Sequence, residues 1–374
     1  MQSIWQTLLI RRMAKRINVT KTHLPSLAEY QNLVEEIWES GQLTNYGEKA
    51  TLLQNNLKSH LDVKHLQLAT NGTIAIQIAI KALELKGEII TTPFSYVATV
   101  SSIVWEGCTP VFVDIRASDY CIDPDKIEAA ITDRTSAILA THVYGNPCAV
   151  EQIQEIATKH NLKVIYDAAH AFDVKINGRS VLTYGDISTI SFHATKVFHS
   201  GEGGAIISQN EELAHRISYL GNFGHNGPED FYGLGVNGKV SEFHAALGLC
   251  VLPHMPSIIA NRRNTVELYD SLLIDELRIA RMSIAENVTH NYSYYPVLLQ
   301  SEQSLLEVKD ALNEANIFPR RYFYPSLNKL PYLRNHTTMP IAESVSERIL
   351  CLPLSSDQDN DDTAKICSII LKNL

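Results

Sequence analysis

The feature that most constrains the fold of this chain is an alternation, repeated from about residue 65, of short apolar runs and amphipathic segments. Two of these segments, 73–85 and 96–107, are predicted to be helices, and further helical stretches are expected on both sides of 136–143. The predicted strands are 65–69, 88–92, 110–115, 136–143, 163–167, 187–192 and 205–208. Apolar strands joined by crossover helices predict an α/β fold with a mostly parallel sheet that is covered on both faces.

The pattern changes after about residue 250. A long helix is expected over 257–273, an alternating strand over 291–299 and another helix over 304–315. We therefore predict a large domain over 17–250, which includes an N-terminal helical segment, and a smaller α+β domain over 251–374. Residues 1–16 are interpreted as an extension, and Met13 is an alternative first residue.

Composition and charge exclude several classes of protein. With 45% hydrophobic and 20% charged residues, the 374-residue chain is typical of a soluble globular protein. Its formal net charge of −9 argues against a general nucleic-acid binder, which would carry a basic face. No uncharged apolar run approaches the roughly 18 to 20 residues that cross a bilayer, so no membrane span is expected.

The cysteines and the N-terminal stretch bear on the compartment. The 6 cysteines are widely scattered, with no CxxC pair and no histidines at zinc spacing, so we expect buried thiols, a reducing compartment and no metal site. Positive charges follow the apolar stretch 4–10, whereas an export signal has them in front. A cytoplasmic protein is therefore predicted.

Ligands of open parallel sheets bind where the strands end, so the polar residues at those positions are the candidates for a site. Gly72 and Thr73 follow the first predicted strand and open a helix, where free N–H groups and the helix dipole favour a phosphate. An ordinary helix cap is the alternative. Asp167 closes the strand 163–167 and could hold a cationic ring nitrogen, although a cap or a salt-bridge partner is the commoner role. His170 is close enough to line the same pocket, and a structural histidine is its alternative.

The third candidate is Lys196, which stands just past the strand 187–192 and before the double glycine 203–204. Burial at that place would lower the pKa of its amine and make it an imine-forming nucleophile, whereas most lysines in loops are simply exposed. Pyridoxal phosphate needs a phosphate cradle, an aromatic ring beside it, a carboxylate on its pyridine nitrogen and a lysine for its aldehyde. The three candidates, taken together at successive strand ends, indicate a site for that cofactor.

From about Ile17 onward the chain resembles the DegT/DnrJ/EryC1/StrS family of sugar aminotransferases, which have the fold-type-I aminotransferase architecture. The resemblance is carried by an ordered series of motifs. These are Leu43-Thr44-Asn45-Tyr46-Gly47, Asn71-Gly72-Thr73, Thr92-Pro93-Phe94-Ser95-Tyr96-Val97-Ala98-Thr99, Asp167-Ala168-Ala169-His170-Ala171, Ser191-Phe192-His193-Ala194-Thr195-Lys196, Gly235-Val236-Asn237-Gly238-Lys239 and the terminal stretch 347–354.

The resemblance implies a role for each matching residue. Lys196 would bond covalently to the aldehyde of pyridoxal phosphate, and Asp167 would keep the pyridine nitrogen protonated. Tyr96 would stack on the ring face, and His170 would sit beside the ring.

The resemblance also implies a phosphate site that two chains build together. Gly72, Thr73 and Ser191 of one subunit and Asn237 of the other would bind the phosphate. A site shared in this way implies a homodimer.

The activity implied is transamination, because the family's dehydratases have a histidine where this chain has Lys196. The implied donor is L-glutamate and the implied acceptor a nucleotide-linked keto-sugar. The run 196–204 looks most like enzymes that make dTDP-4-amino-4,6-dideoxy-D-glucose, which favours carbon 4 of dTDP-4-dehydro-6-deoxy-D-glucose and a role in lipopolysaccharide O-antigen synthesis. Amination at carbon 3 and a non-catalytic, cofactor-binding regulator are the alternatives.

The acceptor contacts are the least defined part of this prediction. An acidic enzyme needs local cations for a diphosphate, and the candidates for acceptor contacts are Thr44, His193, Lys239, Arg320, Arg321, Tyr322 and Tyr324. For each of them a solvated surface position is the alternative. Residues 233–238 spell GxGxxG, but no apolar strand precedes them, so a nicotinamide oxidoreductase is not supported.

Overall fold

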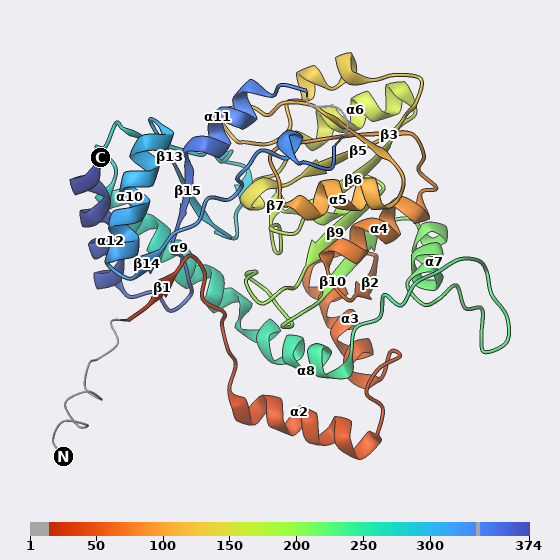
Figure 1. The fold of residues 1–374 in the computed structure, drawn as a ribbon. Helices are drawn as coiled ribbons and strands as arrows, with labels where there is room; N and C mark the ends of the chain where they lie inside the picture. Colours follow the sequence, from red (N-terminus) through yellow and green to blue (C-terminus); the bar gives the residue numbers. More distant parts are fainter. Residues whose placement is uncertain (1–14, 334–336) are drawn as a thin grey trace.

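The computed structural model describes residues 15–333 and 337–374, so the predicted extension 1–16 lies outside the described residues except for its last two (Figure 1). A seven-stranded sheet forms the centre of the molecule. Its strands, in spatial order, are β2 (His65–Ala69), β10 (Gly204–Ser208), β9 (Ile187–Ser191), β6 (Lys163–Asp167), β5 (Thr135–Thr141), β3 (Glu88–Thr91) and β4 (Thr109–Phe112). Within this sheet β10 runs opposite to the other six strands, which all run in one direction, and this confirms the predicted mostly parallel sheet.

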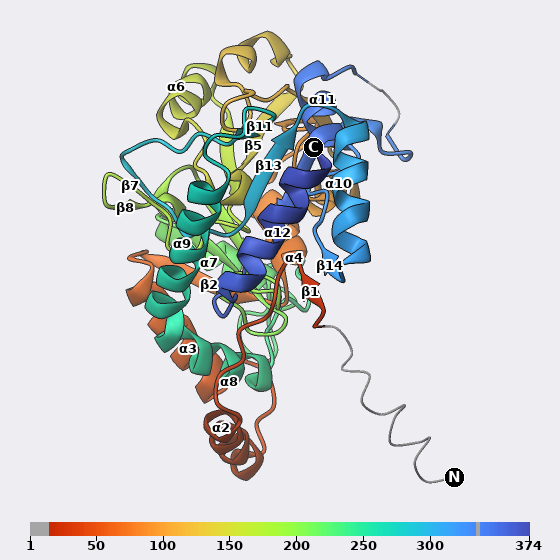
Figure 2. The same cartoon turned by 90° about the vertical axis from the view of Figure 1, so that its left-hand side faces the viewer.

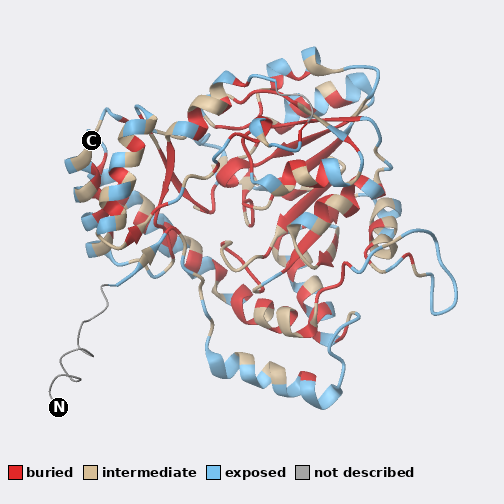
Figure 3. Ribbon diagram, viewed as in Figure 1, coloured by how far each residue is buried: buried red, intermediate tan, exposed pale blue. Residues whose placement is uncertain are grey.

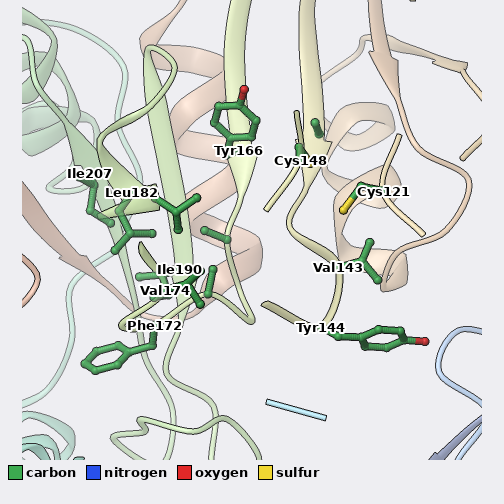
Figure 4. Close-up of a cluster of buried hydrophobic side chains, with 14 of the residues drawn as sticks. Cys121, Val143, Tyr144, Cys148, Tyr166, Phe172, Val174, Leu182, Ile190 and Ile207 are labelled. Atoms are coloured by element: carbon green, nitrogen blue, oxygen red, sulfur yellow. The ribbon is translucent and has the colours of Figure 1, made fainter. Parts of the chain in front are cut away.

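Successive residues of the central strands face opposite sides of the sheet, and each side has its own apolar core. Ile89 of β3 lies in one cluster of buried residues and Ile90 in the other, and Ile206 and Ile207 of β10 divide in the same way. The helices α4 (Gly72–Ala82) and α7 (Glu211–Leu220) cover the first face, and α3 (Glu48–His60) and α6 (Val150–His160) cover the second. Figure 3 shows the buried strands between partly exposed helices, and Figure 4 shows part of the larger cluster.

Several helices begin at a residue whose side chain accepts a backbone N–H of the first turn. Asn71 caps α4, Asn210 caps α7 and Ser241 caps α8 (Glu242–Val251). Such caps satisfy donors that a helix start leaves without a partner. The helix α5 (Val97–Trp105) has no such cap and begins directly after Tyr96.

One predicted element is wrong. Between β4 and β5 the structure has only two short 3₁₀ turns, Pro124–Lys126 and Glu128–Ala130, where a crossover helix was expected. Asp123 caps the first turn through the backbone N–H of Asp125, and the chain leaves the second turn in an extended conformation at Ile131. The segment therefore reaches β5 without a regular helix.

The C-terminal part is built around a small sheet of β11 (Ile279–Arg281), β13 (Tyr295–Leu299) and β15 (Ile349–Leu352). Its helices are α9 (Met255–Leu272), α10 (Glu302–Glu314), α11 (Pro340–Arg348) and α12 (Asn360–Asn373), as Figure 2 shows from the side. A further small sheet joins β7 (Lys175–Ile176), β8 (Arg179–Ser180) and β12 (Val288–Thr289). The predicted strand 291–299 begins only at Tyr295, because the residues before it bond to another part of the chain.

The start of the described chain lies on this C-terminal part. Strand β1 (Ile17–Asn18) pairs in parallel with β14 (Ile317–Phe318), and the carbonyl of Val19 accepts the N–H of Leu354 at 3.0 Å. The predicted large domain begins at residue 17, whereas in the structure residues 17–19 bond to the C-terminal part. The long helix α2 (Leu27–Ser40) then runs alongside α8 (Figure 1).

By length and hydropathy alone, residues 242–272 could cross a membrane. This stretch consists of α8, a short 3₁₀ turn and α9. Ala245, Val251 and Met255 of this stretch are buried in the larger apolar core, and α8 packs against α3. Several apolar side chains of the stretch thus contribute to the core of the folded protein.

Candidate active site

The candidate residues of three strand ends meet at one edge of the sheet. Strands β2, β6 and β9 run in the same direction, so their carboxyl ends lie together. A cavity of about 370 Å³ opens there between the central sheet and the C-terminal part. The predicted site residues that line it are Gly72, Thr73, Tyr96, Asp167, His170, Ser191, His193, Lys196, Arg320 and Tyr322.

Lys196 enters the cavity from a tight turn after β9. The turn is closed by backbone hydrogen bonds from Lys196 N to the carbonyl of His193 and from Ala194 N to that of Gly201, both at 2.8 Å. Burial lowers the pKa of Lys196 to about 8, and the negative charge of Asp167 opposes this effect. Near neutral pH a far larger fraction of this amine is therefore unprotonated than in an ordinary lysine.

Asp167 ends β6 and is buried, with only 5% of its surface exposed. Its Oδ2 atom accepts the hydroxyl of Thr99 at 2.7 Å, and its Oδ1 atom accepts the backbone N–H of Ala169 at 3.1 Å. Burial raises the pKa of Asp167, whereas both hydrogen bonds and the nearby Lys196 lower it. The carboxylate is thus an acceptor held in a fixed orientation at the wall of the cavity.

His170 is buried beside Asp167, and its ring is fixed from several sides. The backbone N–H of Tyr144 donates to Nδ1 at 3.2 Å, so the neutral ring carries its proton on Nε2. Phe323 stacks against the ring, with centroids 5.9 Å apart, and Tyr294 meets it edge-on. Burial lowers the pKa of His170 well below its usual value, so the imidazole is neutral at physiological pH.

The start of helix α4 also lines the cavity and could bind an anion. Asn71 caps the helix by accepting the N–H of Ile74 at 2.9 Å, which leaves the backbone N–H groups of Gly72 and Thr73 for a ligand. Ser191 lies opposite, and a Cβ atom at Gly72 would come within 3.0 Å of the Ser191 Cβ. Gly204, the second residue of the double glycine 203–204, also has no room for a side chain, because a Cβ atom there would lie 2.7 Å from the carbonyl carbon of Asn71.

Aromatic side chains enclose the remaining space. Tyr96 is 54% exposed at the mouth of the cavity, at the start of α5. Tyr294, Tyr322 and Phe323 reach the cavity from the C-terminal part. Of these, Tyr322 is a predicted acceptor contact, whereas no sequence pattern indicates Tyr294 or Phe323, because neither lies in a motif or at the end of a strand of the central sheet.

Only some of the predicted acceptor contacts line the cavity. Arg320 lines the cavity, with its guanidinium 5.0 Å from the ring centre of Tyr322. Arg321 points elsewhere, since it pairs with Glu302 at 2.6 Å and lies over the ring of Tyr324 at 3.5 Å. Neither Arg321 nor Tyr324 lines the cavity.

Three other predicted residues also lie outside the cavity of this chain. Thr44 is exposed in the loop before α3, and Asn237 is exposed on the long loop that follows α7 (Figure 1). Lys239 is buried, with its Nζ atom 4.4 Å from the ring centre of Phe223. Any contact of these three with a bound ligand would have to involve another chain or a different arrangement of the loops.

The arrangement fits pyridoxal phosphate. The helix start with its free N–H groups suits the phosphate, and the close approach of Gly72 to Ser191 leaves that cradle without a side chain in it. The buried carboxylate of Asp167 suits a protonated ring nitrogen, and Lys196 presents an amine of lowered pKa to the same cavity. Within the described residues, no group of three or more histidine, cysteine or acidic side chains could hold a metal ion.

Comparisons with known proteins agree with this geometry. A model of the DegT/DnrJ/EryC1/StrS aminotransferase family matches residues 26–371. A dTDP-4-amino-4,6-dideoxy-D-glucose transaminase of Shigella dysenteriae is 43% identical over 363 residues, which cover 96% of this chain and 99% of the relative. A protein of the same name from Escherichia coli is 42% identical over 365 residues, covering 96% and 98%.

A solved structure, that of DesI in the presence of its TDP-sugar product, has the same fold. It matches with a TM-score of 0.91 and 30% sequence identity, over 96% of this chain and 93% of that one. The match thus covers both the central sheet and the C-terminal part.

Proposed function

Because this chain belongs to the DegT/DnrJ/EryC1/StrS aminotransferase family, we propose that it moves the amino group of L-glutamate to dTDP-4-dehydro-6-deoxy-D-glucose. The chain is a pyridoxal phosphate-dependent nucleotide-sugar aminotransferase, and its product is a 4-amino-4,6-dideoxy sugar. The observation that carries this proposal is the meeting of Lys196, Asp167 and the start of α4 in one cavity. The choice of sugar is supported by the names of the relatives that are 43% and 42% identical.

Bound pyridoxal phosphate supplies an electron sink that makes the carbon next to the transferred nitrogen acidic. The Nζ atom of Lys196 would take a proton from the α-carbon of the amino donor, as general base, and would deliver it to the carbon that was the cofactor's aldehyde, as general acid. A pKa of about 8 suits both tasks near neutral pH, because each protonation state of the amine is then well populated.

Other residues of the cavity hold the cofactor and shield the reacting centre. The carboxylate of Asp167 would accept a hydrogen bond from the protonated ring nitrogen, and the N–H groups of Gly72 and Thr73 would bind the phosphate together with Ser191. The neutral ring of His170 would offer its Nε2–H to the cofactor without adding charge. Tyr96 would cover the ring, and Tyr294 and Phe323, which line the cavity from the C-terminal part, would help to exclude water.

Arg320 is the cation that we propose for the acceptor's diphosphate. It lines the cavity and has no carboxylate partner among the ion pairs of the described residues, whereas Arg321 is already paired with Glu302. A guanidinium suits phosphate oxygens because its donors match their geometry. His193, whose Nδ1 bonds to the Thr195 hydroxyl at 2.8 Å, lies at the same mouth of the cavity.

We also propose that two chains share each active site. The loop after α7 exposes large apolar side chains to solvent, among them Phe231 at 57% and Leu234 at 77%. Exposed apolar groups in such number favour a protein partner. Asn237 stands on the same loop and would reach the phosphate cradle of a second copy.

The compartment and the pathway are proposals of the same kind. All 6 cysteines are free and buried, which supports a reducing compartment, and we place the reaction in the cytoplasm. Use of the amino sugar in the O-antigen of lipopolysaccharide is proposed from the sequence resemblance alone.

The proposed function is tested by offering the purified enzyme L-glutamate with either the 4-keto or the 3-keto form of dTDP-6-deoxyhexose. The expected result is an amine at carbon 4 from the first sugar, identified by NMR of the product, and no product from the second. An amine formed only from the 3-keto sugar would contradict the proposed acceptor and leave the chemistry intact. A protein that binds the cofactor but transfers nitrogen to neither sugar would support a regulatory homologue.

A further inference from the structure

Asp167 stands at the end of an unbroken row of buried hydroxyl groups. Thr141 donates to Ser95 at 3.1 Å, Ser95 and Thr99 are 2.7 Å apart, and Thr99 donates to the Oδ2 atom of Asp167 at 2.7 Å. The three hydroxyl-bearing residues are at most 3% exposed. Water therefore has little access to this row, and its hydroxyl groups depend on one another for hydrogen bonds.

The row connects three neighbouring strands of the sheet. Thr141 ends β5 and is the direct partner of Asp167 in the pairing of β5 with β6. Ser95 lies in the loop after β3, and Thr99 lies in the first turn of α5. A row that starts beside Asp167 thus runs through the neighbouring loop and helix and returns to the same carboxylate.

An ionised Asp167 fixes the direction of every hydrogen bond in the row. A carboxylate can only accept, so Thr99 must donate to it. A hydroxyl has one proton, so Thr99 can only accept from Ser95, and Ser95 in turn can only accept from Thr141. All three protons then point toward the carboxylate, and each bond polarises the next.

We propose that Thr99, Ser95 and Thr141 are positioning residues whose aligned hydroxyls hold Asp167 as the anionic partner of the cofactor's ring nitrogen. This inference rests on the proposed function, because it requires pyridoxal phosphate beside Asp167. Burial by itself favours a neutral carboxyl group, and the charge of Lys196 is a minor influence that opposes this. The row, acting through Thr99, and the backbone N–H of Ala169 therefore both keep the shared proton on nitrogen and away from the carboxyl group, and Thr99 has the larger effect.

The test measures directly whether the cofactor's ring nitrogen is protonated. Holoenzyme is loaded with 15N-labelled pyridoxal phosphate, and the 15N chemical shift distinguishes a protonated from an unprotonated ring. We expect a protonated ring in the wild type. In Thr99→Val the ratio of protonated to unprotonated ring should fall roughly tenfold, since a hydrogen bond to a charged group is lost. Ser95→Ala and Thr141→Val should give progressively smaller changes in the same direction.

Two matched variants separate the hydroxyl from its packing. Thr99→Ser keeps the donor and should restore the wild-type shift. Thr91→Val removes another fully buried hydroxyl, which bonds only to the carbonyl of Leu139 at 2.8 Å, and should leave the shift unchanged. If Thr99→Val does not bind the cofactor, Ser95→Ala decides the question alone.

The proposal is overturned if Ser95→Ala and Thr99→Val retain the wild-type 15N shift, or if Thr99→Ser departs from it as far as Thr99→Val does. A wild-type protein that binds no labelled cofactor would instead contradict the proposed function. The two failures are therefore distinguishable in one experiment.

Discussion

The carboxylate of Glu242 lies against the start of helix α3, where its Oε2 atom accepts the backbone N–H of Lys49 at 2.7 Å. Its Oε1 atom accepts the N–H of Ala50 at 3.1 Å. This carboxylate is the reason for a glycine at position 47, because a Cβ atom there would lie 2.6 Å from it. Glu242 also donates its own N–H to the carbonyl of Leu43, so one buried residue ties α8 to the loop that contains Thr44.

We therefore expect Glu242→Ala to destabilise the protein by about 1 to 3 kcal/mol, because two helix-start donors lose a charged acceptor. The measurement is chemical denaturation followed by circular dichroism. Glu267→Ala is the control, since Glu267 is 58% exposed in a surface pair with Arg263 and should cost about 0.5 kcal/mol or less. Equal losses in the two variants would contradict the capping role of Glu242.

A second prediction concerns the pH at which Lys196 reacts. Only the unprotonated amine attacks an aldehyde, so the rate at which cofactor-free protein bonds to pyridoxal phosphate should rise with pH through about 8 and then level off. Asp167→Asn should move the midpoint to lower pH, because the carboxylate raises the pKa of Lys196. Stopped-flow absorbance measures the rate.

In that experiment the Lys196→Ala variant measures how fast the other lysines react with pyridoxal phosphate, and this background rate is subtracted. A wild-type midpoint near 10.5, the ordinary value for a lysine, would show that the amine is not desolvated in solution. A shift of the Asp167→Asn midpoint to higher pH would contradict the assigned influence of the carboxylate.

A third prediction concerns Arg262, a buried cation of α9 that donates only to backbone carbonyls. Its guanidinium donates to Tyr292 at 2.8 Å, Ser293 at 2.6 Å and Leu354 at 3.2 Å. Ser293 in turn donates its hydroxyl to the carbonyl of His170 at 2.5 Å, so Arg262 supports the wall of the cavity. Arg262→Met should cost about 2 to 4 kcal/mol, since three carbonyls lose their donor.

The neighbouring Arg263→Met is the matched control, because Arg263 is 62% exposed and pairs with Glu267 on the helix surface. Thermal unfolding of both cofactor-free variants measures the difference. A loss for Arg262→Met within about 0.5 kcal/mol of the control would contradict its supporting role.

A fourth prediction distinguishes the two adjacent arginines at the cavity. Arg320→Gln should raise the KM for the sugar nucleotide roughly tenfold, because a charged donor to the diphosphate is lost. Arg321→Gln should leave that KM nearly unchanged, since Arg321 is paired with Glu302 outside the cavity. Steady-state kinetics with each substrate varied in turn gives both values. A rise in the KM for glutamate alone would instead assign Arg320 to the amino donor.

The central sheet and the chemistry at its edge could be predicted from the sequence because both depend on local patterns. Buried strands give continuous apolar runs, and Asp167 and Lys196 follow such runs directly. The order of strands within the sheet has no local signature. The missing helix between β4 and β5 shows a further limit, since the turn at Asp123-Pro124 overrides the helical pattern of the residues that follow.

Contacts between distant parts of the chain could not be predicted. Phe323 and Tyr294 complete the cavity only because the C-terminal part folds back over the sheet edge. Ser293 and Asn291 both bond to the carbonyl of His170, which delays the start of the predicted strand 291–299 to Tyr295 because their side chains compete with regular pairing. The pairing of Ile17 with Ile317 is equally remote in sequence.

The most direct measurement of the central claim is mass spectrometry of the holoenzyme after reduction with borohydride and proteolysis. We expect the mass of reduced pyridoxal phosphate on a single peptide, and fragmentation should place it on the Nζ atom of Lys196. In Lys196→Ala that adduct should be absent. An adduct on another lysine, or an unmodified Lys196 in protein that has bound the cofactor, would contradict the assignment of this site.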